Sequence, residues 1–92
     1  DEPFDNSEKT EKISNQMMKK YVPMVREALE EIIPYYKNQK EFEIILENAE
    51  LYVNDAEKFL EEGQDEVAIL SIGYADGLVD ALRLAKGLEP KM

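Results

Sequence analysis

The sequence predicts an all-α fold: a three-helix up-down-up bundle with a long, proline-kinked first helix and a tight antiparallel hairpin of helices two and three. Apolar residues recur every three or four positions over long segments, and no segment alternates with the period of a strand. A turn of two or three residues around a glycine joins the last two segments, which forces them to run antiparallel. The 92 residues are expected to form a single helical domain, 1–92.

The first helix is predicted at 6–37, after a disordered start at 1–5. Asp5 is followed three residues later by Glu8, a spacing that resembles a capping box. From there the apolar residues keep one helical phase as far as Tyr36.

Pro23 interrupts the hydrogen-bond ladder of this helix without breaking its phase. We therefore predict a kink near 19–23, with two consecutive helices as the alternative. The half after Pro23 packs on the hairpin, and the half before it overhangs the bundle or folds back. The overhanging half carries a candidate interface of adaptable apolar residues: Ile13, Met17, Met18 and Tyr21. The alternative is that these residues cap the end of their own bundle.

The second helix is predicted at 39–62 and has the clearest periodicity in the chain. Asn38 followed by Glu41 is a cap signal, and Gly63 suits the left-handed position that ends a helix. One face collects the apolar residues Phe42, Ile45, Leu46, Ala49, Tyr52, Val53, Ala56, Phe59 and Leu60.

The third helix is predicted at 66–86, capped by Asp65 and ended by Gly87. It contains Gly73 and Gly77, although a glycine in a helix costs about 1 kcal/mol relative to alanine.

A helical wheel centred on Tyr74 has the two glycines of the third helix on one flank. Such a strip of small residues lets another helix approach closely. We therefore expect the rings of Tyr52 and Phe59, on the second helix, to fill the space beside Gly73 and Gly77.

Two carboxylates of the third helix have different predicted surroundings. Asp76 is expected to face solvent. Asp80 lies at the rim of the hairpin, with Asp55 across from it, and is expected to make structural hydrogen bonds. The alternative is a ligand or divalent-metal site, or an acid–base site, that uses Asp55 and Asp80 with Tyr52 and Tyr74.

The composition removes several kinds of chemistry. The chain has no cysteine and no histidine, which excludes thiol nucleophiles, disulfides, a histidine base and ordinary structural zinc sites. We predict no catalytic residue, no metal ligand and no cofactor. The net charge of −10 disfavours nucleic acid, and the candidate cations are interleaved with glutamates: Lys9, Lys12, Lys19, Lys20 and Arg26.

The longest apolar stretch, 67–85, is interrupted by Asp76, Asp80 and Arg83, so we predict no membrane span. No leader-like segment opens the chain, and we expect a cytoplasmic protein.

The second half of the chain is similar to the archaeal family known as domain of unknown function 357, small all-helical proteins without an established activity. The pattern covers roughly residues 48–85 and consists of Tyr52, Asp55, Ala56, Phe59, Gly63, Ala68, Tyr74, Ala75, Gly77, Leu78, Asp80 and Ala81. The resemblance implies an archaeal cytoplasmic helical bundle and supplies no catalytic residue. The aspartate that usually follows the turn glycine is displaced here by one position, to Asp65.

These observations favour a small, acidic, non-enzymatic helical bundle that binds a protein partner or associates with itself as a homodimer. Its competitor is the carboxylate site described above.

Overall fold

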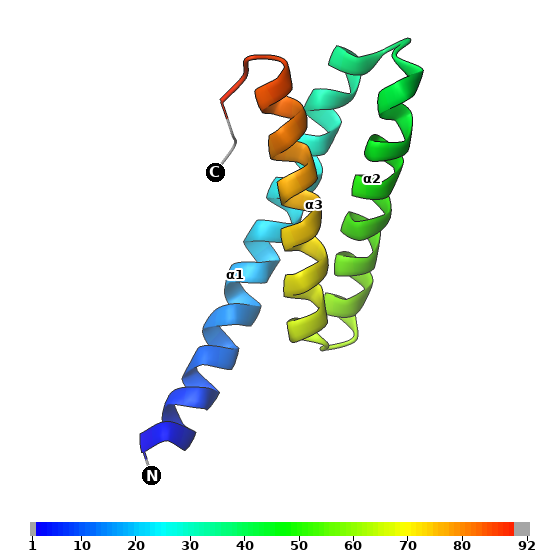
Figure 1. Cartoon of the computed structure of the whole chain (residues 1–92). Coiled ribbons are helices and arrows are strands. Elements are labelled where there is room, and N and C mark those ends of the chain that lie inside the picture. The colour runs from blue at the N-terminus through cyan, green and yellow to red at the C-terminus, as the bar shows by residue number, and fades with distance from the viewer. Residues whose placement is uncertain (1, 90–92) are drawn as a thin grey trace.

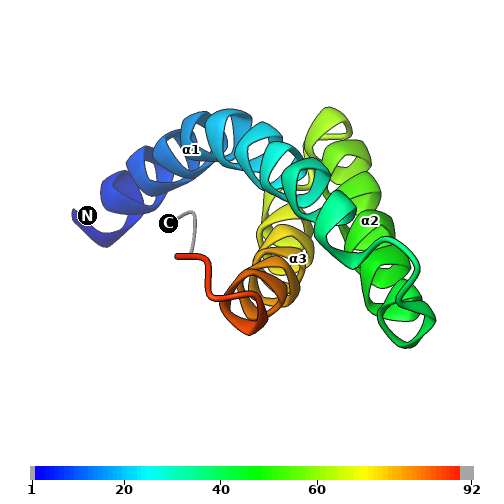
Figure 2. The same cartoon turned by 90° about the horizontal axis from the view of Figure 1, so that it is seen from above.

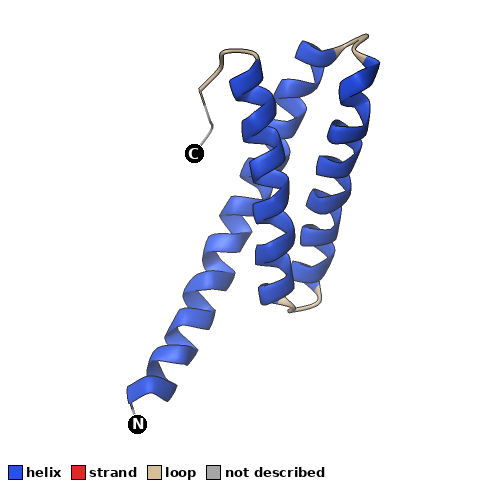
Figure 3. Cartoon of the chain, in the orientation of Figure 1, coloured by secondary structure: helices blue, strands red, loops and turns tan. Residues whose placement is uncertain are grey.

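The structure is a computed structural model that describes residues 2–89, with side chains from 15 to 89. Its elements are α1 (Glu2–Ile32), the short 3-10 helix η1 (Ile33–Tyr36), α2 (Lys40–Glu61) and α3 (Asp65–Ala85). Residues 2–89 contain no strand (Figure 3). The predicted all-α class with three main helices is confirmed.

From blue to red, the chain in Figure 1 rises through α1, descends through α2 and rises again through α3. The first part of α1 extends past the turn that joins α2 to α3, so the molecule is long and narrow, 55 × 25 × 16 Å. Viewed from above, α1 crosses the hairpin of α2 and α3 obliquely (Figure 2). The hairpin helices pack most closely against each other.

The start of α1 differs from the prediction. The helix begins at Glu2 rather than at residue 6, so residues 2–5 are helical and Asp5 lies inside the helix instead of capping it. Pro3 is compatible with this start, because the first turn of a helix needs no backbone donor and the proline ring already holds a helical φ.

The two prolines of this segment act differently. α1 continues through Pro23 as one helix, so the alternative of two consecutive helices is wrong, while the kink near 19–23 stays a prediction. At Pro34 the α-helix gives way to η1, so the predicted helix at 6–37 ends early, at Ile32. Pro34 cannot donate to the carbonyl four residues earlier and disfavours α geometry at Ile33.

Turn residues end the helices. Asn38 has a φ of 70° and is a left-handed turn residue, so the predicted cap moves to Gln39. Gly63 and Gly87 have φ values of 77° and 74°, as predicted for the residues that end α2 and α3. After α2, the Gly63 and Gln64 amides donate to the Leu60 and Phe59 carbonyls at 3.2 and 2.8 Å, which forms a Schellman motif.

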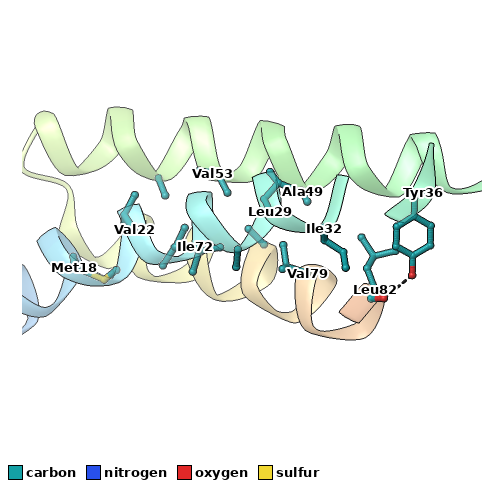
Figure 4. Packing of buried hydrophobic residues seen from close by; sticks show 14 residues of the cluster. Met18, Val22, Leu29, Ile32, Tyr36, Ala49, Val53, Ile72, Val79 and Leu82 are labelled. Carbon is teal, nitrogen blue, oxygen red and sulfur yellow. Dashed lines mark hydrogen bonds between the residues drawn. The ribbon is translucent and has the colours of Figure 1, made fainter. Parts of the chain in front are cut away.

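One apolar cluster occupies the interior between the three helices (Figure 4). Its buried members are Met18, Val22, Val25, Ala28, Leu29, Ile32, Tyr36, Ala49, Val53, Ala56, Ile72, Ala75, Val79 and Leu82. Most of the apolar face predicted for the second helix is confirmed: Ala49, Val53 and Ala56 are fully buried, and Phe42, Ile45, Leu46 and Leu60 pack against the core. Tyr52, which was predicted on this face, is exposed.

Tyr36 closes one end of this interior. Its hydroxyl donates to the Leu82 carbonyl at 2.5 Å (Figure 4). The centroid of its ring lies 4.8 Å from that of the Phe42 ring. The ammonium group of Lys86 sits 4.6 Å from the Tyr36 ring centroid. Burial raises the pKa of this tyrosine, so its hydroxyl keeps the proton that it donates.

We expect Gly63→Ala to lower the free energy of unfolding by about 1–2 kcal/mol, because a Cβ disfavours the left-handed φ of this turn. For a domain of this size the melting temperature would fall by roughly 4–8 °C per kcal/mol. Thermal and urea denaturation would measure the change. Gly63→Asn is the matched control, since asparagine tolerates the same backbone, and equal losses in both variants would contradict the explanation.

Candidate functional site

The residues of the carboxylate hypothesis do not form a recognisable metal centre. Asp55 is exposed on α2, whereas Asp80 is half-buried on α3. Among the residues whose side chains are described, no group of three or more histidines, cysteines, aspartates or glutamates could hold a metal ion. Tyr52 and Tyr74 do meet, with ring centroids 4.5 Å apart, and join α2 to α3 near the surface. A catalytic or ligand role for these four residues stays a prediction.

The structure pairs Asp76 with a residue of α1. The hydroxyl of Tyr21 donates to Oδ2 of Asp76 at 2.7 Å, and both side chains are half-buried. The prediction that Asp76 faces solvent is therefore wrong. Asn15 makes a similar connection between α1 and α3, donating from Nδ2 to both carboxylate oxygens of Asp65 at 3.1 Å.

The prediction that Asp65 caps the third helix is wrong. Asp65 is the first residue of α3, and the N-cap is Gln64.

Burial, the hydrogen bond to Asp76, and the charges of Asp76 and Asp80 all raise the pKa of Tyr21 well above its usual range. A tyrosine in these surroundings keeps its proton. Its hydroxyl therefore serves as a hydrogen-bond donor rather than as a base. Tyr21, which was predicted as an interface residue, connects α1 to α3 within the chain. The sequence held one signal of this contact, because a tyrosine in the phase of a buried face needs a partner for its hydroxyl.

The candidate interface on α1 separates into buried and exposed residues. Met18 is only 3% exposed and belongs to the core, so its assignment to an interface is wrong. Met17 is 62% exposed, and it lines a shallow hollow of about 310 Å³ with Lys20, Tyr21 and Met24. The side chain of Ile13, the remaining member, lies outside the described side chains.

The outward face of α3 exposes no charged side chain between Val67 and Ala85. The exposed positions from Val67 to Ala85 carry only apolar or aromatic side chains or glycine: Val67, Ile69, Leu70, Gly73, Tyr74, Gly77, Ala81, Leu84 and Ala85. Leu70 is 74% exposed and Leu84 is 58% exposed. The charged residues of this stretch are Asp76, Asp80 and Arg83, and all three are half-buried. We call the set Leu70, Gly73, Tyr74, Gly77, Ala81 and Leu84 the α3 face.

This arrangement corrects the predicted orientation of the third helix. Tyr74, the centre of the predicted helical wheel, is 54% exposed. The residues turned inward are Ala68, Ser71, Ile72, Ala75, Val79 and Leu82. Because α3 is apolar on nearly all sides, its periodicity could not distinguish the core face from the outer one.

The two glycines of α3 do not accommodate Tyr52 and Phe59, contrary to the prediction. Gly73 and Gly77 are exposed, and a Cβ added to either would meet no atom within 4 Å. The small residues inside the bundle are instead alanines, including Ala68 and Ala75 of α3. Packing within one chain therefore does not compensate the helical cost of the two glycines.

One cation of the nucleic-acid alternative is engaged elsewhere. Arg26 binds Glu57 of α2 through two donors, Nε at 2.6 Å and the terminal nitrogen at 3.0 Å, and also donates to Asn54. This bidentate pair connects α1 to α2 and raises the pKa of the guanidinium group. Arg26 is thus occupied within the fold.

Tyr21→Phe should lower the free energy of unfolding by about 1 kcal/mol near neutral pH, because Asp76 loses a donor in a half-buried position. The variant should also lose less stability in alkali. Since the pKa of Tyr21 is raised in the fold, this group stabilises the native state fully below its ordinary value of about 10, and the contribution is lost as the pH rises further.

Urea denaturation of both proteins near pH 7 and above about pH 10 would test this sign. Tyr35→Phe, which changes an exposed tyrosine, is the control. A parallel decline of Tyr21→Phe and the parent protein above pH 10 would contradict the assignment.

Gly77→Ala should raise the free energy of unfolding by about 0.5–1 kcal/mol, because the added methyl enters open space and alanine is the better helix former. Chemical denaturation of dilute protein would measure it. The same substitution at Gly63 has the opposite expected sign. A loss of stability at position 77 would mean that the glycine serves packing within the chain.

The comparisons with known proteins identify a family and add no activity. No curated protein and no solved structure matches the chain. Within the part that the structure describes, no helix is both long enough and apolar enough to span a membrane. Residues 20–88 match the family described as protein of unknown function, DUF357. The matched segment covers α2, α3 and the second part of α1, so the chain belongs to this family.

Proposed function

We propose that this protein is a non-enzymatic docking module that binds another protein through the α3 face. One observation carries the proposal: every exposed position of α3 from Val67 to Ala85 is apolar, aromatic or glycine. In a chain with 35% charged residues and a net charge of −10, an exposed stretch of this length without a charge is unexpected. Contiguous exposed apolar surface of this kind is typical of interaction sites.

The energetics favour burial of this face. Burying a leucine side chain completely contributes about 1.5–3 kcal/mol, and Leu70 and Leu84 have most of that burial still to gain. Gly73 and Gly77 lie between them and allow the backbone of a partner to come close. The glycines would thus compensate their helical cost in the complex rather than in the single chain.

One neighbouring feature extends the same surface, and a second candidate contact lies on α1. The ring of Tyr52 lies against Tyr74 on the α2 side of the face. The hollow lined by Met17, Lys20, Tyr21 and Met24 belongs to α1, and Tyr21 reaches α3 at Asp76. It contains Met17 and Tyr21, two of the four residues of the interface predicted from the sequence.

The proposal predicts that Leu70→Glu combined with Leu84→Glu abolishes binding while the fold is kept. Both positions are exposed and glutamate is a good helix former, so the free energy of unfolding should change by about 0.5 kcal/mol or less. Binding should weaken at least about tenfold, because the two leucines that the complex would bury become charged glutamates.

Capture from an extract of the source cells would identify a partner, and calorimetric titration of that purified partner would give the dissociation constant. Ile44→Glu combined with Leu51→Glu is the control, since it places the same charges at exposed apolar positions of α2. Equal affinity for the parent chain and the α3 variant would overturn the proposal, as would equal weakening by the control.

A further inference from the structure

The α3 face has a symmetric pattern along the helix. Gly77 stands at its centre, with the small residues Gly73 and Ala81 four positions before and after it. Leu70 and Leu84 stand seven positions before and after it, and both are more than half exposed. Read in either direction from Gly77, five of the six residues of the face follow one order, a small residue and then a leucine. The sixth, Tyr74, has the half-buried Asp80 as its counterpart three positions after Gly77.

A helix face with this symmetry is complementary to itself. When two such helices lie antiparallel about a two-fold axis through Gly77, Leu70 of one copy meets the partner's Leu84, and Gly73 meets the partner's Ala81. This is the isologous geometry of closed dimers, in which one surface patch serves both subunits. A parallel pair would instead set each residue against its own copy, an arrangement that makes no use of the symmetry of the face about Gly77.

We propose that the occupant of the α3 face is a second copy of this chain, bound as an antiparallel, two-fold symmetric pair of α3 helices that cross at Gly77. This inference rests on the proposed docking function and names the partner.

The space around the glycines supports a close crossing. A Cβ at Gly73 or Gly77 would meet nothing within 4 Å in the single chain, so the backbone of α3 is open at the centre of the face. Two backbones can approach there more closely than the 8–10 Å typical of helices that pack through larger side chains. The leucines at the two ends would then close over the crossing.

The charge pattern also favours a second copy over a charged partner. The α3 face has no charged side chain, so a basic or acidic partner surface would find no ion-pair partner on it. The surface that fits it is itself uncharged, small at the centre and apolar at both ends. This chain carries that surface, and none of the six residues of the face is charged, although the net charge of the chain is −10.

The size of the face indicates a reversible dimer. It contains six residues per copy, with Tyr52 and Tyr74 in contact at its edge, whereas a stable interface of about 800 Å² per partner uses roughly 20–30 residues on each side. We therefore expect association that depends on protein concentration, with monomer and dimer both present near a dissociation constant in the micromolar range, roughly 1–100 μM.

Sedimentation equilibrium of the full chain up to about 0.5 mM, which exceeds that range, tests the proposal. The average mass should rise with concentration from 10.6 kDa toward twice that value. Gly77→Glu should remain monomeric throughout, because it places a bulky carboxylate opposite its own copy at the axis, while open space leaves the monomer folded. Leu51→Glu adds the same charge on α2 and should dimerise like the parent chain.

Cysteine cross-linking tests the register, since the chain has no cysteine of its own. Gly77→Cys should form a disulfide-linked dimer under mild oxidation, and Leu51→Cys should not. A mixture of Leu70→Cys and Leu84→Cys should cross-link to each other in preference to like pairs. Preferred linkage of Leu70→Cys to itself would indicate a parallel pair and overturn the antiparallel geometry.

The outcomes separate this inference from the docking function. The proposed pair is overturned if the chain stays monomeric at every concentration. It is also overturned if the Gly77→Glu variant dimerises as strongly as the parent chain. If a different protein or a lipid vesicle binds the monomeric chain, and Leu70→Glu with Leu84→Glu prevents it, the second copy is ruled out as the occupant. If the ligand is another protein, the docking function stands and only the proposed pair is overturned. If only a vesicle binds, both the proposed pair and the docking function are overturned.

Discussion

The close packing of α2 against α3 determines how α1 packs on the hairpin and which side of α3 faces solvent. Alanines at Ala49, Ala56, Ala68 and Ala75 are fully buried, so the hairpin has little side-chain bulk at these positions. α1 then lies across the hairpin and supplies the larger side chains, such as Leu29 and Ile32, that complete the interior. The buried alanines of the hairpin leave room for the side chains of α1, and all three helices also supply larger residues to the core, such as Val53 of α2 and Ile72 of α3.

The same packing determines the rotation of α3 about its own axis. With Ile72, Val79 and Leu82 turned inward, Leu70 and Leu84 must point outward. The outer face is thus a consequence of the inner one. Polar contacts with α1 stabilise this orientation, because Tyr21 reaches Asp76 and Asn15 reaches Asp65. A rotation of α3 would break both hydrogen-bonded connections and expose the core.

The predictions succeeded where one physical signal dominated. The second helix has a continuous apolar stripe with a mostly charged surface opposite it, so most of its buried residues could be identified from spacing alone. Gly63 and Gly87 ended their helices as expected, because glycine has a specific role at left-handed positions. The third helix had no such contrast, and Tyr74 was therefore assigned to the wrong side. The tyrosine–aspartate contact joins residues 55 positions apart, so no local pattern could reveal that Asp76 is its acceptor.

The sequence by itself determined that this protein is helical, where its turns lie and which face of the second helix is buried, since these depend on local periodicity and on the backbone preferences of single residues. It also determined that thiol and histidine chemistry are absent, because the chain contains neither residue. Only the tertiary structure decided which side of α3 faces the core, and therefore that Gly73 and Gly77 line an open apolar surface instead of a packed hairpin. The physical reason is that a helix apolar on nearly every side can bury either face, and the choice depends on how well each face fits α1 and α2.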